Sequence, residues 1–289
     1  MKDNDYEENE RSDNTDKFSI GKCFGCYFTH YTTVLKVSAC SYITNLISFV
    51  IGAFVSIFVI FYLGSNDSNS VLSILTGTDM DLSDMFGDNQ GSFYLVMLGT
   101  FILTASSLIC FNVLQNGFLQ IYRNVFAGYV TDFFSEYKDG VKSNLGKSFL
   151  SMIISWILTS VFLYSICFYR FNFGKTGIFL SVVSVIILFV LFWVQNMVNY
   201  MIVSVEDSLI NMYKNAFICI LLELPRILFF SLIFTVILFV IPTLYLLFVP
   251  QYAFPITVLY FAFFAFGTVS FFSSYLTSFC ISKYIYSEN

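Results

Sequence analysis

Histidine and charged residues are scarce in this chain, and each scarcity excludes a class of protein. The 289 residues include one histidine, His30, two tryptophans and only 11% charged residues. Soluble domains carry charge on about a quarter of their residues, so an ordinary water-soluble fold is excluded. A single histidine, with no Gly-rich phosphate loop and no nucleophile elbow, leaves no candidate catalytic or cofactor-binding residues. We therefore expect a protein without enzymatic activity, cofactor or nucleic-acid partner.

Potential metal ligands are equally few. The segment Cys23-x-x-Cys26-x-x-x-His30 has metal-like spacing, but tetrahedral zinc needs four ligands, and the remainder would have to come from cysteines inside apolar runs. The alternative interpretation is an interfacial anchor rich in Tyr, Phe and small residues, and we favour it, so no metal site is predicted. The seven cysteines are scattered and define no disulfide framework.

What the chain has in abundance is apolar sequence. Hydrophobic residues make up 57% of it, and several apolar runs exceed the roughly 18 residues that indicate a membrane-spanning helix. The pattern predicts an all-α membrane protein with six transmembrane helices, whose first partner is the lipid bilayer. The expected spans are residues 38–63, 92–122, 149–169, 178–203, 227–248 and 254–281.

The distribution of basic residues predicts the orientation of these spans. Residues 64–91 contain five Asp and neither Lys nor Arg, whereas 12 of the 14 basic residues fall in segments on the other side of the membrane. By the positive-inside rule, both termini are cytoplasmic and the acidic loop 64–91 is extracellular, in a multi-pass protein of the cell membrane. Residues 1–20 form an acidic tail expected to be disordered, and residues 21–286 form the six-span domain.

Two cytoplasmic segments are expected to be amphipathic interfacial helices. In residues 123–147, apolar side chains recur at steps of three and four, which predicts one helix lying in the headgroup layer or on a partner at that depth. The segment 204–226 predicts a second such helix. Each places a Lys and an Asn shortly before an apolar run. Either an internal duplication or the general character of interfacial helices explains this likeness.

Amide side chains inside two of the spans predict polar faces that point into the helix bundle, because an amide in hydrocarbon must find a partner. Interhelical packing is one interpretation of these faces, and a path for a small neutral solute between spans two and four is the other. The candidate intramembrane polar residues are Asn112, Gln115, Asn116, Gln195, Asn196 and Asn199. Small residues in the sixth span recur at steps of three and four, which favours close helix packing within the chain or across a homodimer. They are Gly267, Ser270, Ser274 and Ser278.

Two patches of the sequence resemble the YesL-like integral membrane proteins of Gram-positive bacteria, a family of unknown function. The central patch matches the family at Gly117, Arg123, Asn124, Ser135, Glu136, Tyr137, Lys138, Asp139, Lys142, Asn144 and Ser148. The second patch matches at Lys214, Asn215, Ala216, Leu224 and Pro225, and Asn45 resembles an Asn of the family's first span. The chain departs from the family at Asn112-Val113, at Gly128-Tyr129 and in its longer loop 64–91.

The resemblance implies an accessory role beside carbohydrate uptake, because genes of the family often lie next to those of carbohydrate ABC transporters. An ABC transporter or another membrane protein is then the candidate partner. The candidate interaction face comprises Arg123, Asn124, Glu136, Tyr137, Lys138, Lys142, Asn144, Lys214, Asn215 and Pro225.

A partial likeness to ABC permeases points to the same kind of partner. Their coupling helix begins with Glu-Ala-Ala, has a Gly six residues after the Glu and ends in Leu-Pro. Here Glu206 and Leu224-Pro225 match, but Met212 occupies the Gly position and Asp207-Ser208 replace the alanines. Two functions therefore remain open, an accessory or interaction protein and a permease- or channel-like carrier of a small neutral solute.

Overall fold

The computed structural model describes residues 19–45, 113–129 and 132–285, and every regular element in these ranges is helical. The chain divides into two compact units. The first unit contains residues 1–43, 113–151 and 193–289, and the second contains residues 44–112 and 152–192.

Four helices are long and apolar enough to cross a membrane, which makes this a multi-pass membrane protein. They are Phe133–Ile166, Gly174–Ser204, Leu224–Tyr245 and Pro255–Tyr284. They overlap the four expected spans between residues 149 and 281, and the first of them begins earlier than expected. The expected spans 38–63 and 92–122, the loop 64–91 and the tail 1–20 lie mostly outside the described residues. Six spans and the orientation of the chain therefore stay predictions.

The expectation of a single helix over residues 123–147 is wrong. Helix α7 ends within this range (Gln115–Phe126), and a separate helix, α8 (Phe133–Asn172), begins at Phe133. Gly128 has a φ of +76°, and the amide of Tyr129 donates to the carbonyl of Asn124 at 3.0 Å while that of Gly128 donates to Val125 at 3.1 Å. This bonding is a Schellman motif, which ends a helix at a residue in left-handed conformation.

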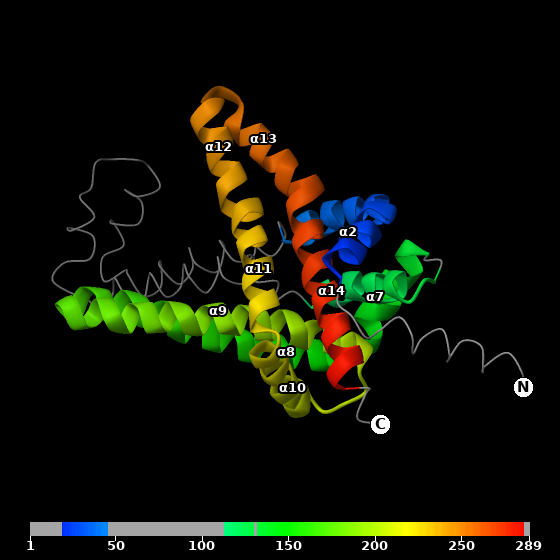
Figure 1. The fold of residues 1–289 in the computed structure, drawn as a ribbon, viewed down its shortest axis with the longest axis horizontal. Helices are drawn as coiled ribbons and strands as arrows, with labels where there is room; N and C mark the ends of the chain where they lie inside the picture. The colour runs from blue at the N-terminus through cyan, green and yellow to red at the C-terminus, as the bar shows by residue number, and fades with distance from the viewer. Residues whose placement is uncertain (1–18, 46–112, 130–131, 286–289) are drawn as a thin grey trace, which may run out of the picture. The chain divides into compact units, whose positions relative to one another are not determined.

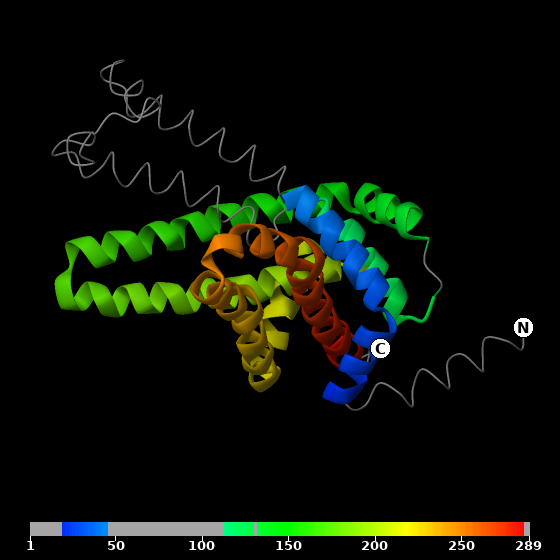
Figure 2. The same ribbon diagram turned by 90° about the horizontal axis from the view of Figure 1, so that it is seen from above.

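Helix α8 continues without a break from the amphipathic segment into the third expected span. Its 40 residues extend about 60 Å at 1.5 Å per residue, about twice the thickness of a bilayer's hydrocarbon core. One end of α8 therefore projects beyond the hydrocarbon. In the second unit, the remainder of α8 pairs with α9 (Gly174–Ser204) as a helical hairpin (Figure 2), with Gly174 at a φ of +51° in the turn.

The first unit is organised around α14 (Phe266–Tyr284), which packs on α2 (Ile20–Thr29), α7 and α11 (Leu224–Thr235). An aromatic cluster fills these contacts. Tyr27 of α2 stacks on Phe272 at 5.2 Å between ring centroids, and Phe271 meets Tyr122 at 5.5 Å and Phe126 at 5.3 Å. Aromatic side chains therefore join α14 to α2 and α7.

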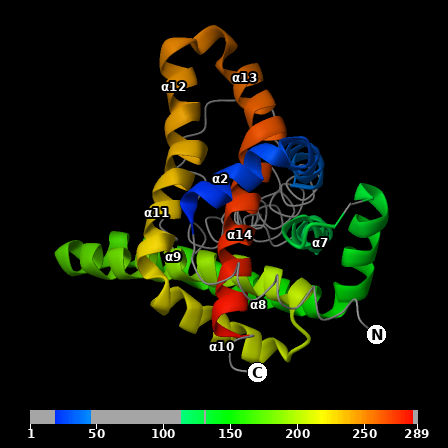
Figure 3. The same ribbon diagram turned by 45° about the vertical axis from the view of Figure 1, so that its right-hand side comes forward.

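The last two spans form a second helical hairpin (Figures 1 and 3). Helix α11 passes through a π-helical turn, η1 (Val236–Val240), into α12 (Ile241–Phe248), and Pro242 lies in the first turn of α12. Pro242 lacks the N–H that would continue the ladder, and the wider π turn accommodates that loss. The 3₁₀ turn η2 (Pro250–Tyr252) connects to α13 (Ala253–Tyr260), which reaches α14 through another π turn, η3 (Phe261–Ala265).

The small residues of the sixth span face other helices of the chain. A Cβ on Gly267 would collide with the carbonyl oxygen of Val34 and lie 2.7 Å from Cβ of Ser38, on the helical segment 31–45. Ser270 accepts a hydrogen bond from Nε2 of Gln115 at 3.3 Å. For these two positions the small side chains serve packing within the chain.

Candidate functional site

The carboxyl end of α9 is held by two cations from neighbouring helices. Nη1 of Arg123, on α7, donates to the carbonyl oxygen of Val203 at 2.9 Å. Nζ of Lys147, on α8, donates to the carbonyl oxygen of Asp207 at 2.9 Å, just after α9 ends. Cations at this end of a helix satisfy its last carbonyls and oppose its negative dipole, so both residues fix where the chain leaves α9.

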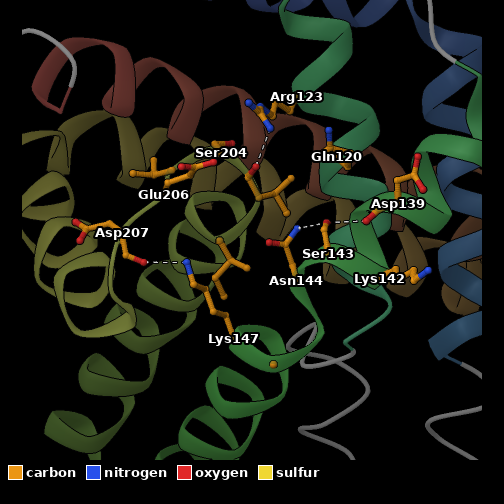
Figure 4. Close-up of a pocket in the computed structure, with 14 residues that line it drawn as sticks. Gln120, Arg123, Asp139, Lys142, Ser143, Asn144, Lys147, Ser204, Glu206 and Asp207 are labelled. Atoms are coloured by element: carbon orange, nitrogen blue, oxygen red, sulfur yellow. Dashed lines mark hydrogen bonds between the residues drawn. The ribbon is translucent and has the colours of Figure 1, made fainter.

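A polar cavity of about 1120 Å³ opens around these contacts (Figure 4). Three elements line it, namely α7, the first turns of α8, and the end of α9 with the residues that follow. Its lining includes Gln120, Arg123, Asp139, Lys142, Ser143, Asn144, Gly146, Lys147, Ser204, Glu206 and Asp207, with Ile202, Val203 and Val205 as the apolar members. We call this space the polar cavity.

The polar cavity brings together part of the predicted interaction face and residues that sequence reasoning did not select. Arg123, Lys142 and Asn144 belonged to that face, and all three line the cavity. Glu206 was singled out only for its likeness to a coupling-helix motif. Gln120, Ser143 and Lys147 were not selected. Gln120 lies three residues before Arg123, Lys147 lies three after Asn144, and Ser143 lies four before Lys147. This spacing was the available signal, because residues three or four apart share a helix face.

Asp207 stabilises the start of helix α10 (Leu209–Leu222) through hydrogen bonds. Its Oδ1 accepts hydrogen bonds from the Ser208 amide at 2.6 Å and from Nδ2 of Asn211 at 2.9 Å. The hydrogen bond from Asn211, followed by that from the Ser208 amide, holds the pKa of this carboxyl below its ordinary value. Ser208 caps α10 by accepting from the Asn211 amide at 3.3 Å.

Other residues of the predicted face have structural roles or lie elsewhere. The ring of Tyr137 packs on that of Phe118 at 4.7 Å, and Asn124 accepts from Nε2 of Gln120 at 3.4 Å. Glu136 is half-buried in the first turn of α8, and Lys138 is exposed. Lys214, Asn215 and Pro225 belong to α10 and α11, and the first and last of these are exposed. Only part of the proposed face therefore gathers in one place.

The buried amides form two groups with different partners. Gln115 donates to Ser270 of α14, and Asn116 donates to Ser148 of α8. Nε2 of Gln195 donates to Oγ of Ser151 at 2.9 Å and to Oδ1 of Asn199 at 2.8 Å. All four amide side chains belong to residues at most 8% exposed. Asn196 is half-buried, and Asn112 lies outside the described residues.

Helix α10 has one packed side and one exposed side. On the packed side, the buried residues are Met212, Ala216, Cys219 and Ile220, which contact the rest of the first unit. On the opposite side, Ile210 is 80% exposed, Phe217 49% and Leu221 60%, with the exposed Lys214 among them. We call Ile210, Phe217 and Leu221 the apolar stripe of α10. The helix is unbroken at Met212, where the coupling-helix motif would place Gly.

Glu223 forms the elbow between α10 and α11. It is 3% exposed, pairs with Arg226, and accepts from Nζ of Lys283 at 3.1 Å and from the Tyr284 hydroxyl at 2.6 Å. Burial by itself would raise the pKa of Glu223. The hydrogen bonds from Tyr284 and Lys283 and the charge of Arg226 outweigh burial and hold the pKa below its ordinary value. The elbow thus ties the end of α14 to the junction of α10 and α11.

The cysteines of α2 are in an environment unsuited to thiolate chemistry. Cys23 is 0% exposed, and burial, with a smaller contribution from Cys26, raises its pKa to about 12. In residues 19–45, 113–129 and 132–285, no group of three or more His, Cys, Asp or Glu side chains is arranged to hold a metal ion.

No protein-family model, curated protein or solved structure matches this chain. The resemblance to the YesL-like proteins therefore stays a prediction.

Proposed function

We propose that this chain is a membrane accessory protein without catalytic or transport activity, and that α10 docks into an apolar groove of a cytoplasmic partner. The apolar stripe of α10 carries the proposal. Its members Ile210, Phe217 and Leu221 follow one another at steps of seven and four residues, so they form a single line on the helix. This spacing is that of helices whose apolar anchors fill the groove of a partner protein.

The surroundings of the stripe suit docking by a preformed helix. The hydrogen bonds of Asp207 and Ser208 fix the start of α10, and the Glu223 elbow fixes its end. Little conformational entropy is then lost when a partner binds, and preorganised surfaces gain affinity for that reason. Asn211 and Lys214, both exposed, supply the polar rim that surrounds apolar anchors at protein interfaces.

The nucleotide-hydrolysing subunit of an ABC transporter is the partner we propose. The match of Glu206 and Leu224-Pro225 to the coupling-helix pattern supports this choice, as does the resemblance to YesL-like proteins. Membership of that family, a location in the cell membrane with both termini in the cytoplasm, and a role beside carbohydrate uptake belong to the same proposal.

The carrier alternative requires the intramembrane amides to line a water-filled path. Gln115, Asn116, Gln195 and Asn199 are instead buried and hydrogen-bonded to protein groups. Their role in the proposal is to hold the helices together, at about 0.6 kcal/mol for each interhelical contact.

Site-specific photo-crosslinking in the native cell tests the docking of α10. A photoreactive residue is placed at Phe217 or at Leu221, and at Leu232 of α11 as the control, whose side chain is 65% exposed on a candidate span. We expect Phe217 and Leu221, but not Leu232, to capture the nucleotide-hydrolysing subunit, identified by its peptides. Ile210→Ser should reduce that capture, since it removes an anchor that is 80% exposed and packs little within this chain.

The pattern of capture decides between partners. If Phe217 and Leu221 capture only lipid, as Leu232 is expected to do, α10 is an in-plane membrane helix and the proposal is wrong. Capture that Ile210→Ser leaves unchanged would also contradict it.

A further inference from the structure

We infer that the polar cavity binds the headgroup of a phosphatidylethanolamine-type phospholipid, a phosphodiester joined to a primary ammonium group. This site is separate from the stripe of α10 and does not depend on the docking proposed above. The inference stands on three features of the cavity, which are its unused donors, its unused carboxylates and its depth.

Cations with unused hydrogen-bond donors form the phosphate-binding side of the cavity. Arg123 and Lys147 each donate one N–H to a backbone carbonyl. A guanidinium has five N–H donors and an ammonium three, so both keep donors for another acceptor. Lys142 also lines the cavity, is exposed, and forms no ion pair or hydrogen bond with residues in the described ranges. Phosphodiester oxygens are strong acceptors for such groups.

Carboxylates form the side of the cavity that would bind the ammonium group. Asp139 and Glu206 are exposed and line the same cavity. Neither forms an ion pair with Arg123, Lys142 or Lys147, since within the described ranges ion pairs occur only at Glu223. Figure 4 shows that Arg123, Glu206 and Lys147, which line the cavity, belong to three different elements. Charges of both signs therefore remain unneutralised in one space, as a zwitterionic ligand requires.

The chemistry of the carboxylates selects among headgroups. A primary ammonium donates three hydrogen bonds to carboxylates, whereas the trimethylated ammonium of phosphatidylcholine donates none. A purely anionic headgroup such as that of phosphatidylglycerol would leave Asp139 and Glu206 without a cationic partner. Ethanolamine is therefore the headgroup that uses both sides of the cavity.

The depth of the cavity matches that of a headgroup. Its lining residues 139–147 directly precede the expected span 149–169 on α8, and residues 202–207 lie where α9 ends. With the expected spans 149–169 and 178–203, the cavity opens where the two helices leave the hydrocarbon, and phospholipid headgroups occupy that layer.

Native mass spectrometry of the delipidated full chain tests this assignment. The protein is exchanged into mixed micelles with phosphatidylethanolamine or with phosphatidylcholine of the same acyl chains, and retained lipid is counted. We expect phosphatidylethanolamine to be retained about tenfold better, and Glu206→Gln to remove that preference. Arg123→Gln should weaken retention of both lipids. Because Arg123 also holds α9, Lys142→Gln is the second variant for the phosphate-binding side. Lys175→Gln, in the first turn of α9 and outside the cavity lining, is the control.

Each result has one meaning. Equal retention of the two lipids by the unmodified chain, or a preference that survives Glu206→Gln, would overturn the assignment. So would retention by Lys142→Gln that equals that of Lys175→Gln. Glycerophosphoethanolamine, which has the headgroup but no acyl chains, is the soluble competitor. If it displaces the lipid at equal concentration, the site belongs to a soluble phosphodiester and the membrane source is wrong.

Discussion

The phenolic hydroxyl of Tyr213, on α10, donates a hydrogen bond to Oε1 of Gln195, on α9, at 3.0 Å. The same hydroxyl lies 3.1 Å from Oγ of Ser151, to which Nε2 of Gln195 also donates. The exposed helix is thereby joined to the buried amides through one side chain. An amide that sequence reasoning assigned to the membrane interior therefore anchors the surface helix whose outer side we propose to dock a partner.

Removal of the Tyr213 hydroxyl should loosen α10 selectively. Tyr213→Phe leaves Oε1 of Gln195, which is 4% exposed overall, without this donor, and we expect the chain to lose about 1 kcal/mol of stability. Hydrogen–deuterium exchange in detergent should become faster at the amides of residues 209–222, while those of α14 keep their protection. An equal increase in α10 and α14 would show that the hydrogen bond stabilises the whole unit rather than the attachment of α10.

The Glu223 elbow should make stability depend on pH. The pKa of Glu223 in the folded chain lies below its ordinary value of 4.5, so its partners stabilise the folded state above that pH. This contribution is lost as the pH falls below 4.5 and through the lower folded pKa, because the carboxyl is then protonated. Glu223→Gln should lower stability by about 1–2 kcal/mol at neutral pH, and the two proteins should converge in acid.

Thermal unfolding of the two proteins in detergent, followed between neutral and acid pH, measures this convergence. Their difference is the informative quantity, since other carboxyl groups titrate in both. A difference in melting temperature that stays constant across the pH range would contradict the assigned role of the Glu223 charge.

Close helix packing at Gly267 should tolerate no larger side chain. An alanine there would collide with the carbonyl oxygen of Val34 and crowd Ser38, so α14 and the segment 31–45 must separate. We expect Gly267→Ala to cost about 2 kcal/mol or more. Gly25→Ala is the matched control, because Gly25 lies within α2 and nothing approaches its Cβ position within 4 Å. That substitution should be neutral or raise stability by up to about 1 kcal/mol. Equal melting temperatures for the two variants would refute the packing role.

Much of the helical architecture could be predicted from the sequence because lipid imposes a simple rule. Backbone groups in hydrocarbon must be bonded within the helix, so long apolar runs identify spans. The runs ending at Ser204 and beginning at Leu224 accordingly appear as helices of membrane length. The helix expected over residues 204–226 is present in part, as α10 over Leu209–Leu222. Its expected bounds are wrong, because Ser208 caps α10 at its start and Leu224–Arg226 belong to α11.

What failed, or could not be foreseen, depended on backbone conformation and on contacts distant in sequence. The apolar periodicity of residues 123–147 continues through Gly128, although that residue adopts a positive φ and ends α7. Periodicity reports which residues share a face but not whether the helix is continuous. Likewise, no spacing rule pairs Glu223 with Lys283 and Tyr284, which lie about sixty residues away and meet it only in the folded chain.

Thiol labelling of the buried amides separates the accessory protein from the carrier. In a background without the native cysteines, Gln115→Cys, Asn116→Cys, Gln195→Cys and Asn199→Cys are each treated with a small membrane-impermeant reagent. Right-side-out and inverted vesicles are used, so both faces of the membrane are tested. We expect no labelling at any of the four positions from either face, because each native side chain is buried against protein partners.

Two exposed positions provide the positive controls, one in the first half of α8 and one in the first turn of α9. Ser143→Cys, at the polar cavity, and Lys175→Cys, near the turn after α8, should each be labelled from one face only, and from opposite faces. By the positive-inside prediction, Ser143 is reached from the cytoplasm and Lys175 from outside. Labelling of two or more amide positions from the face that reaches Lys175 would require an aqueous path past the middle of the spans. The carrier function would then replace the accessory one. Amides that are buried and hydrogen-bonded to protein groups are not accessible from a water-filled path.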